Sequence, residues 1–205
     1  MNLELFHSPE LVVFTTRDFA RAANVSVTAA SHQLSRRRRS SRSFRQLTRG
    51  VWANVSHPQF GPLLCVPALL GAEQGYVSFL TALHLHGAIS QIPASIQVAT
   101  TGHPRKLQTD VALFEFFQLK PELHLAGVEW STTFPPYRIA TVEKALLDTF
   151  YIATRKKRRF AKLPELHLRD AKFSARQFRN LLKLAKLPQP IASAVDKLWR
   201  TSAHI

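Results

Sequence analysis

The sequence predicts an α+β fold, and three observations support this prediction. Residues 15–54 have the pattern of two short helices followed by two short β-favourable segments. Residues 95–130 contain runs of β-branched and aromatic residues that are typical of strands. Residues 141–202 show apolar residues at helical spacing. Helices and strands are therefore expected in both halves of the chain, with a small sheet and several helices in the second.

A domain boundary is expected where Pro58, Gly61 and Pro62 interrupt regular structure. We place one domain at residues 1–57 and a second at residues 58–205. A chain of 205 residues that is 45% hydrophobic is long enough to bury a core in each part.

Positive charge is concentrated at the two ends of the chain. The net charge is +15, with nine basic against three acidic residues in 1–57, and fourteen against three in 151–205. Such localisation is typical of a surface that binds a polyanion. The single cysteine, Cys65, excludes an internal disulfide and a multi-cysteine zinc site, and we expect it to be buried. No apolar stretch approaches the roughly 20 residues of a membrane span and no secretion signal is visible, so we expect a cytoplasmic protein.

The segment TTRDFARAANVS (15–26) predicts a short helix, a turn and the start of a second helix. Thr15 or Thr16 can cap the first helix, and Asp18 is favourable in its first turn. Asn24 can adopt a left-handed conformation that ends this helix, and Ser26 can cap the next.

The second helix has two unlike faces. Val27, Ala30 and Leu34 fall together on the apolar side at 100° per residue. The opposite face is polar and basic, and it consists of Thr28, His32, Ser35, Arg36 and Arg39. Such a face suits a helix in the DNA major groove. Arg37 and Arg38 project toward the apolar side, so we expect the helix to end near Arg37 and the chain to turn there.

A hairpin is predicted next. SFRQLT and VWANV are β-favourable and are joined at TRG, where Gly50 can supply the positive φ of a tight turn. A helix-turn-helix followed by a two-stranded hairpin predicts a winged helix. Winged helices also bind proteins, but nine basic residues against one acidic residue after position 16 favour DNA. The residues expected to contact DNA are Thr28, Ser31, His32, Ser35, Arg36, Arg39, Arg42, Arg45 and Arg49.

In the second part we expect buried short helices at 62–74 and 78–89, and strands at 95–102 and 110–119 joined by a basic turn. A third strand is expected within 124–130. Amphipathic helices are predicted at 141–156, 174–186 and 190–202, the first with Val142, Ala145, Leu146 and Phe150 facing inward.

Few residues suggest catalysis. His84 and His86 lack the i, i+4 spacing of a helical zinc pair. Asp110, Glu115 and Glu143 superficially suggest the carboxylates of a metal-dependent nuclease. Glu143 and Lys144, however, stand at a helix start, where the glutamate favours the dipole and the lysine is expected to face solvent. Because no catalytic triad, P-loop or GxGxxG is present, we expect no enzyme, metal or cofactor, with a metal-dependent nucleic-acid-processing enzyme as the alternative.

A second basic surface is predicted near the C-terminus. It is either a solvated face or a site for a polyanion or an acidic partner. Its residues are Lys156, Lys157, Arg158, Arg159, Arg176, Arg179 and Lys183.

Several motifs occur in a familiar order over about residues 11–155. FTTRDFARAANVS and LTRGVWA are followed by YVSFLTALHLHGAISQIP, IQVAT and YRIATVEKALLDTFY. This order resembles the AbiEi family of antitoxins and viral-defence transcriptional regulators. The matching positions are Tyr76, Val77, Ser78, Thr81, Ala82, Leu83, His86, Gly87, Gln91, Ile92, Pro93, Ile139, Ala140, Glu143, Lys144, Ala145, Leu146, Leu147 and Asp148.

The resemblance implies the antitoxin of a type IV toxin–antitoxin pair. Its winged helix would bind inverted repeats in double-stranded DNA upstream of its own operon and repress transcription. Its C-terminal domain would counteract a nucleotidyltransferase-like toxin. The motif residues are implied as fold markers, without a catalytic role. A stand-alone regulator without a toxin, or an adaptor that binds an acidic protein without DNA, are the alternatives.

Overall fold

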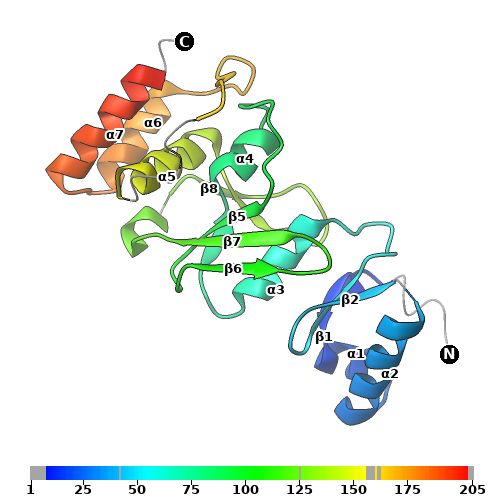
Figure 1. Ribbon diagram of the computed structural model, residues 1–205. Coiled ribbons are helices and arrows are strands. Elements are labelled where there is room, and N and C mark those ends of the chain that lie inside the picture. The colour runs from blue at the N-terminus through cyan, green and yellow to red at the C-terminus, as the bar shows by residue number, and fades with distance from the viewer. Residues whose placement is uncertain (1–7, 42, 125, 156–159, 161–162, 203–205) are drawn as a thin grey trace.

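The computed structural model describes residues 8–41, 43–124, 126–155, 160 and 163–202, and the statements below refer to these residues. They form seven α-helices and two β-sheets, which confirms the mixed α+β architecture (Figure 1). The helices are α1 (Thr16–Ala22), α2 (Val27–Ser40), α3 (Val66–Leu70), α4 (Phe79–Leu85), α5 (Val142–Arg155), α6 (Ala175–Leu184) and α7 (Gln189–Ser202). The strands are β1 (Val13–Thr15), β2 (Phe44–Thr48), β3 (Val51–Asn54), β4 (Gly75–Val77), β5 (Ile96–Thr100), β6 (Arg105–Gln108), β7 (Leu113–Gln118), β8 (Val128–Trp130) and β9 (Arg138–Ala140).

The N-terminal part combines α1 and α2 with a three-stranded antiparallel sheet in the order β1-β3-β2. The predicted hairpin is β2–β3, and Gly50 in its turn has a φ of +76°. Strand β1 was not predicted from the sequence; it pairs with β3, with Phe14 opposite Trp52. One face of this sheet packs on the helices in a small core made of Leu11, Phe14, Phe19, Ala20, Ala30, Leu34, Phe44 and Trp52.

The predicted start and end of α1 and the predicted start of α2 are confirmed. The Thr15 hydroxyl accepts a hydrogen bond from Asp18 N (3.2 Å), and the Asp18 carboxylate accepts one from Thr15 N (2.9 Å). This reciprocal capping box fixes the start of α1. Asn24 has a φ of +50°, and the Ser26 hydroxyl accepts from Ala29 N at the start of α2.

The predicted end of α2 is wrong. The helix continues through Ser40 instead of ending near Arg37. Ala30 and Leu34 are buried as expected, but Val27 is 50% exposed. Arg37 is half-buried and Arg38 is exposed, in the last turn of the helix. Long arginine stems can cover apolar surface while the guanidinium reaches polar groups, so two arginines on this side do not require the helix to end.

The second face of the small sheet is also covered. Val12, Leu47 and Ala53 belong to the hydrophobic cluster that surrounds the large sheet, whereas Phe44 and Trp52 belong to the small core. Because side chains alternate along a strand, β2 and β3 contribute to both clusters. The boundary predicted at residues 57 and 58 falls in segment 55–61, which contains no helix or strand.

The large sheet has six strands in the order β6-β7-β5-β4-β9-β8. The third predicted strand is present as β8, but the expected connection between the first two is wrong. Segment 101–112 is not a simple turn, because it contains β6, which forms an antiparallel hairpin with β7. Strands β5 and β7 therefore run parallel.

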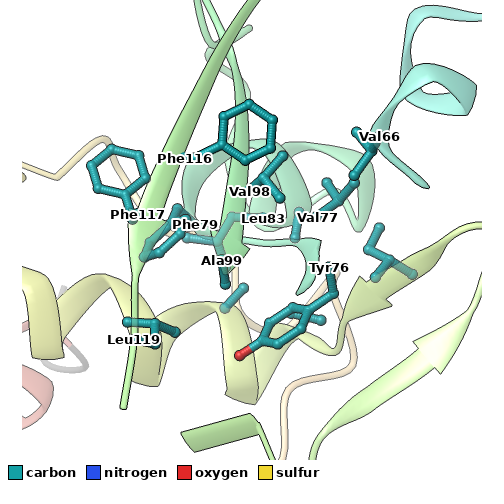
Figure 2. Close-up of a cluster of buried hydrophobic side chains, with 14 of the residues drawn as sticks. Val66, Tyr76, Val77, Phe79, Leu83, Val98, Ala99, Phe116, Phe117 and Leu119 are labelled. Carbon is teal, nitrogen blue, oxygen red and sulfur yellow. The ribbon is translucent and has the colours of Figure 1, made fainter. Parts of the chain in front are cut away.

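The main core lies between the large sheet and its helices. Cys65 is buried there as expected, and Figure 2 shows Tyr76 among aliphatic and aromatic side chains of this cluster. Helix α5 contacts α4, α6 and α7, and its four predicted inward residues are buried. Helices α6 and α7 lie at the end of the molecule opposite to α1 and α2 (Figure 1).

Candidate nucleic-acid interface

The outer side of α2 is a continuous polar and basic surface, here called the basic helix face. Ala30 and Leu34 are fully buried on the inner side and fix the rotation of the helix. The predicted residues on the other side are consequently all exposed: Thr28, His32, Ser35, Arg36 and Arg39. This arrangement presents short hydrogen-bonding side chains at the N-terminal end and guanidinium groups at the C-terminal end. Such groups can contact base edges and phosphates respectively.

An open groove, here called the hairpin groove, lies between α1, α2 and the β2–β3 hairpin. Its lining comes from all three elements: Thr15, Thr16, Arg17, Asp18, Arg21, Val27, Ser31, Ser35, Gln46, Arg49, Gly50, Val51 and Trp52. Ser31, Ser35 and Arg49 of the predicted set meet here. Arg17 and Arg21 were missed, although two arginines four residues apart on the first helix would have indicated them. Their positive charges add to that of Arg49 at this hairpin groove.

Three hydrogen bonds join the hairpin to Thr16 at the start of α1, and the longest of them runs from the Thr16 hydroxyl to Gly50 O (3.5 Å). Trp52 Nε1 donates to the Thr16 hydroxyl (3.0 Å), and Thr16 N donates to Gly50 O (2.9 Å). Because Arg49 adjoins Gly50, these bonds hold the turn and its arginine at the rim of the groove.

A second concave site lies at the C-terminal end of α2. We call it the Asp110 pocket, and its lining residues are Arg38, Arg39, Ser40, Ser41, Arg45 and Asp110. Arg38 Nη1 donates to Gln46 Oε1 (3.1 Å), and its Nη2 lies 3.5 Å from Asp110 Oδ2. The predicted residues Arg39 and Arg45 therefore meet here, apart from Arg49. Arg42 lies outside the described residues.

Two of the motifs that resemble the AbiEi family, at residues 76–93 and 139–148, contribute side chains to a buried polar network between β4 and α5. Asp148 accepts hydrogen bonds from the Ser78 hydroxyl (2.8 Å) and the Tyr76 hydroxyl (3.1 Å), and it pairs with Lys144 one turn earlier. The prediction that Lys144 faces solvent is wrong, because its side chain is only 1% exposed. Its ammonium lies 5.2 Å from the centre of the Tyr76 ring, and α5 as a whole packs against helices α4, α6 and α7. Glu143 is also buried, and it accepts from Ser174 N (2.8 Å).

Burial dominates the electrostatics of this network. It raises the pKa of Asp148 and lowers the pKa of Lys144, while their mutual attraction opposes both changes. His124 packs edge-on against Tyr76, with ring centroids 5.3 Å apart, and burial lowers its pKa to about 4. These contacts join a strand to a helix inside the core, which is the position expected of fold markers.

The carboxylates considered for a nuclease are held separately. Glu115 is buried, accepts from the Ser95 hydroxyl (2.8 Å) and pairs with Lys106 (2.5 Å). Asp110 instead faces Arg38. Within the part of the chain that the structure describes, no group of three or more His, Cys, Asp or Glu could hold a metal ion. His86 Nε2 lies 2.8 Å from Ala140 O.

The second basic surface is described only in part. Arg176, Arg179 and Lys183 are exposed along α6, while Phe178 on the same helix is fully buried. Lys156, Lys157, Arg158 and Arg159 lie outside the described residues. Three predicted residues thus lie on the exposed side of α6, and we call Arg176, Arg179 and Lys183 the α6 face.

No protein-family model and no curated protein sequence matches the chain. Among the described helices, none has the length and apolar character needed to cross a bilayer.

Proposed function

We propose that the chain is a DNA-binding transcriptional repressor whose N-terminal part acts as a winged helix. The observation that carries the proposal is the basic helix face of α2, exposed opposite Ala30 and Leu34. A helix of this composition can enter the major groove, with Thr28, His32 and Ser35 facing base edges. Arg36 and Arg39 then reach guanines or phosphates.

The β2–β3 hairpin has the features of a wing beside this helix. Its turn carries Arg49, and the Trp52–Thr16 hydrogen bond attaches it to α1. When α2 occupies the major groove, Arg49 is placed to reach the backbone or the neighbouring minor groove. Arg17 and Arg21 on the opposite wall of the hairpin groove add positive charge to the same approach.

The proposal is tested by measuring binding to the double-stranded DNA upstream of the gene, against a scrambled duplex of equal length. We expect the upstream inverted repeats to bind at least tenfold more tightly. About six phosphate contacts correspond to a log–log salt slope near −5. A flat salt response would indicate instead a protein-binding hairpin and helix pair.

We further propose that the second part is the antitoxin of a type IV pair, acting against a nucleotidyltransferase-like toxin. The support is the family-like motif order, together with the buried network formed by Tyr76, Ser78, Lys144 and Asp148. Co-expression with the product of an adjacent nucleotidyltransferase-like gene tests this. We expect the full chain to relieve the toxin's growth arrest. A chain that represses transcription but gives no relief would be a stand-alone regulator.

The two proposed activities can be separated. The Arg36→Ala/Arg39→Ala chain is expected to lose repression and keep antitoxicity, because both residues lie on the DNA-facing helix and are exposed. The α6 face is at the opposite end of the molecule (Figure 1). We therefore propose that Arg176, Arg179 and Lys183 contact a partner other than the DNA segment bound by α2.

A further inference from the structure

We propose that Asp110 is a built-in competitor for a DNA backbone phosphate at the Asp110 pocket. The inference rests on the proposed DNA-binding function and adds a phosphate site and its regulator to it. Asp110 comes from the large-sheet part of the chain, whereas the arginines of the pocket come from α2 and β2. A contact between the two parts therefore limits how strongly the DNA-binding part attracts DNA.

The carboxylate is presented from a well-defined turn between β6 and β7. The Thr109 hydroxyl accepts hydrogen bonds from Val111 N (3.1 Å) and Ala112 N (3.0 Å), and donates to Ala112 O (2.8 Å). The hydrogen bonds of the turn thus come from Thr109, so substitution of the Asp110 side chain leaves them in place. This allows the charge to be removed without changing the presentation of the turn.

Arg38 is held at the pocket by two partners of different kinds. Gln46 accepts from Nη1 at 3.1 Å, while Asp110 lies 3.5 Å from Nη2. The Arg38 and Asp110 side chains are 46% and 51% exposed. An ion pair this exposed contributes little to stability. A phosphate can consequently replace Asp110 at Arg38, while Gln46 keeps the guanidinium in position.

The remaining lining of the pocket suits a phosphate. Arg38, Arg39 and Arg45 supply three positive charges against one carboxylate, and Ser40 adds a hydroxyl group. Arginine forks match phosphate oxygens in geometry and charge. Arg39 also belongs to the basic helix face, so the pocket continues the proposed DNA-facing surface at its C-terminal end. A backbone phosphate next to the bases read by α2 would lie here.

A competitor at a phosphate contact changes affinity for all sequences alike, because phosphates carry no sequence information. Asp110 repels the phosphate and occupies Arg38, so its loss should strengthen binding to operator and unrelated duplexes equally.

The matched control is Glu129→Gln. Glu129 is an exposed acid on β8, at the edge of the large sheet opposite to β6, and its removal changes the net charge by the same amount.

The experiment measures the affinity of the full chain for both duplexes at 0.15 M salt. At this ionic strength the Debye length is about 8 Å, so distant charges are screened, and we expect Asp110→Asn to tighten binding roughly three- to tenfold and Glu129→Gln less than twofold. Equal effects of the two variants, with clear binding by the wild-type chain, would overturn the inference. A wild-type chain that binds no duplex would overturn the proposed function instead. A larger gain on single-stranded RNA than on duplex DNA would overturn the assignment to DNA.

A double-mutant cycle separates competition at Arg38 from a general charge effect. In an Arg38→Gln background, Asp110→Asn has less to release, so its gain should shrink toward that of Glu129→Gln. An undiminished gain contradicts competition at this arginine. Thermal unfolding midpoints of all variants show whether each remains folded.

Discussion

Trp52 donates its indole N–H to the hydroxyl of Thr16 over 3.0 Å and so attaches the β2–β3 hairpin to the first residue of α1. The backbone of the same threonine donates to Gly50 O at the turn. Together with a longer bond from the Thr16 hydroxyl to Gly50 O, these contacts of one residue help to set the position of the hairpin relative to the helices. Since Arg49 adjoins Gly50, the orientation of the proposed wing depends on them.

Trp52→Phe keeps a buried aromatic ring and removes this donor. We expect the free energy of unfolding, measured with urea, to fall by more than about 1 kcal/mol, because the Thr16 hydroxyl loses a hydrogen bond and the smaller ring leaves a cavity in the small core. DNA affinity should also weaken through the looser turn at Arg49. Trp130→Phe is the control, because Trp130 is 65% exposed. Equal losses of unfolding free energy for both variants would mean that the Trp52–Thr16 hydrogen bond does not contribute to stability.

Asp148→Ala should be the most destabilising single change in the buried network. It leaves the Lys144 ammonium without its carboxylate at a site where its side chain is 1% exposed. Breaking a buried pair in this way costs about 3–5 kcal/mol. Tyr76→Phe removes only one hydrogen bond to the same carboxylate and should cost about 1 kcal/mol. Similar unfolding midpoints for the two variants would be inconsistent with a buried ion pair.

Stability should decrease as the pH falls, because of His124. Burial lowers its pKa to about 4, below the roughly 6.5 expected in the unfolded chain. Between these values the unfolded state binds a proton that the native state does not, so native stability is lost as the pH falls from about 6.5 to 4, by up to about 3 kcal/mol.

Urea unfolding at pH 7 and at pH 4.5 measures this effect. His124→Gln should reduce the pH dependence, whereas His103→Gln, at an exposed histidine, should leave it unchanged. An unaltered pH dependence in the His124 variant would assign the effect to other groups.

Local chemistry explains which elements of the fold could be predicted. The starts of α1 and α2 depend on Thr15, Asp18 and Ser26, which act on neighbouring residues. Helix α5 follows from apolar spacing over four turns. Strands β1, β4 and β9 were not predicted. Each has three residues, too few to show a period, and β4 pairs with a distant segment through Val77 and Ile139.

The candidate site was predictable on α2 and less so around it. The exposed face from Thr28 to Arg39 follows from helical geometry alone. The contact between Arg38 and Asp110 joins residues far apart in the sequence, and it needs the β6–β7 turn in place. Lys144 was misassigned because a lysine at a helix start usually faces solvent. Here its ammonium instead pairs with Asp148 and lies 5.2 Å from the centre of the Tyr76 ring, which comes from a distant part of the sequence.

The most direct test of the central claim is the salt dependence of DNA binding by the Arg36→Ala/Arg39→Ala chain. Both guanidinium groups are exposed on the basic helix face, so circular dichroism should show an unchanged fold. Two lost phosphate contacts should flatten the slope of log K against log salt by about 1.8 and weaken operator binding at least tenfold. Arg176→Ala/Arg179→Ala, which removes the same charge from the α6 face, should change affinity less than twofold. Unchanged operator affinity and slope in the α2 variant would contradict the proposal that this helix binds DNA.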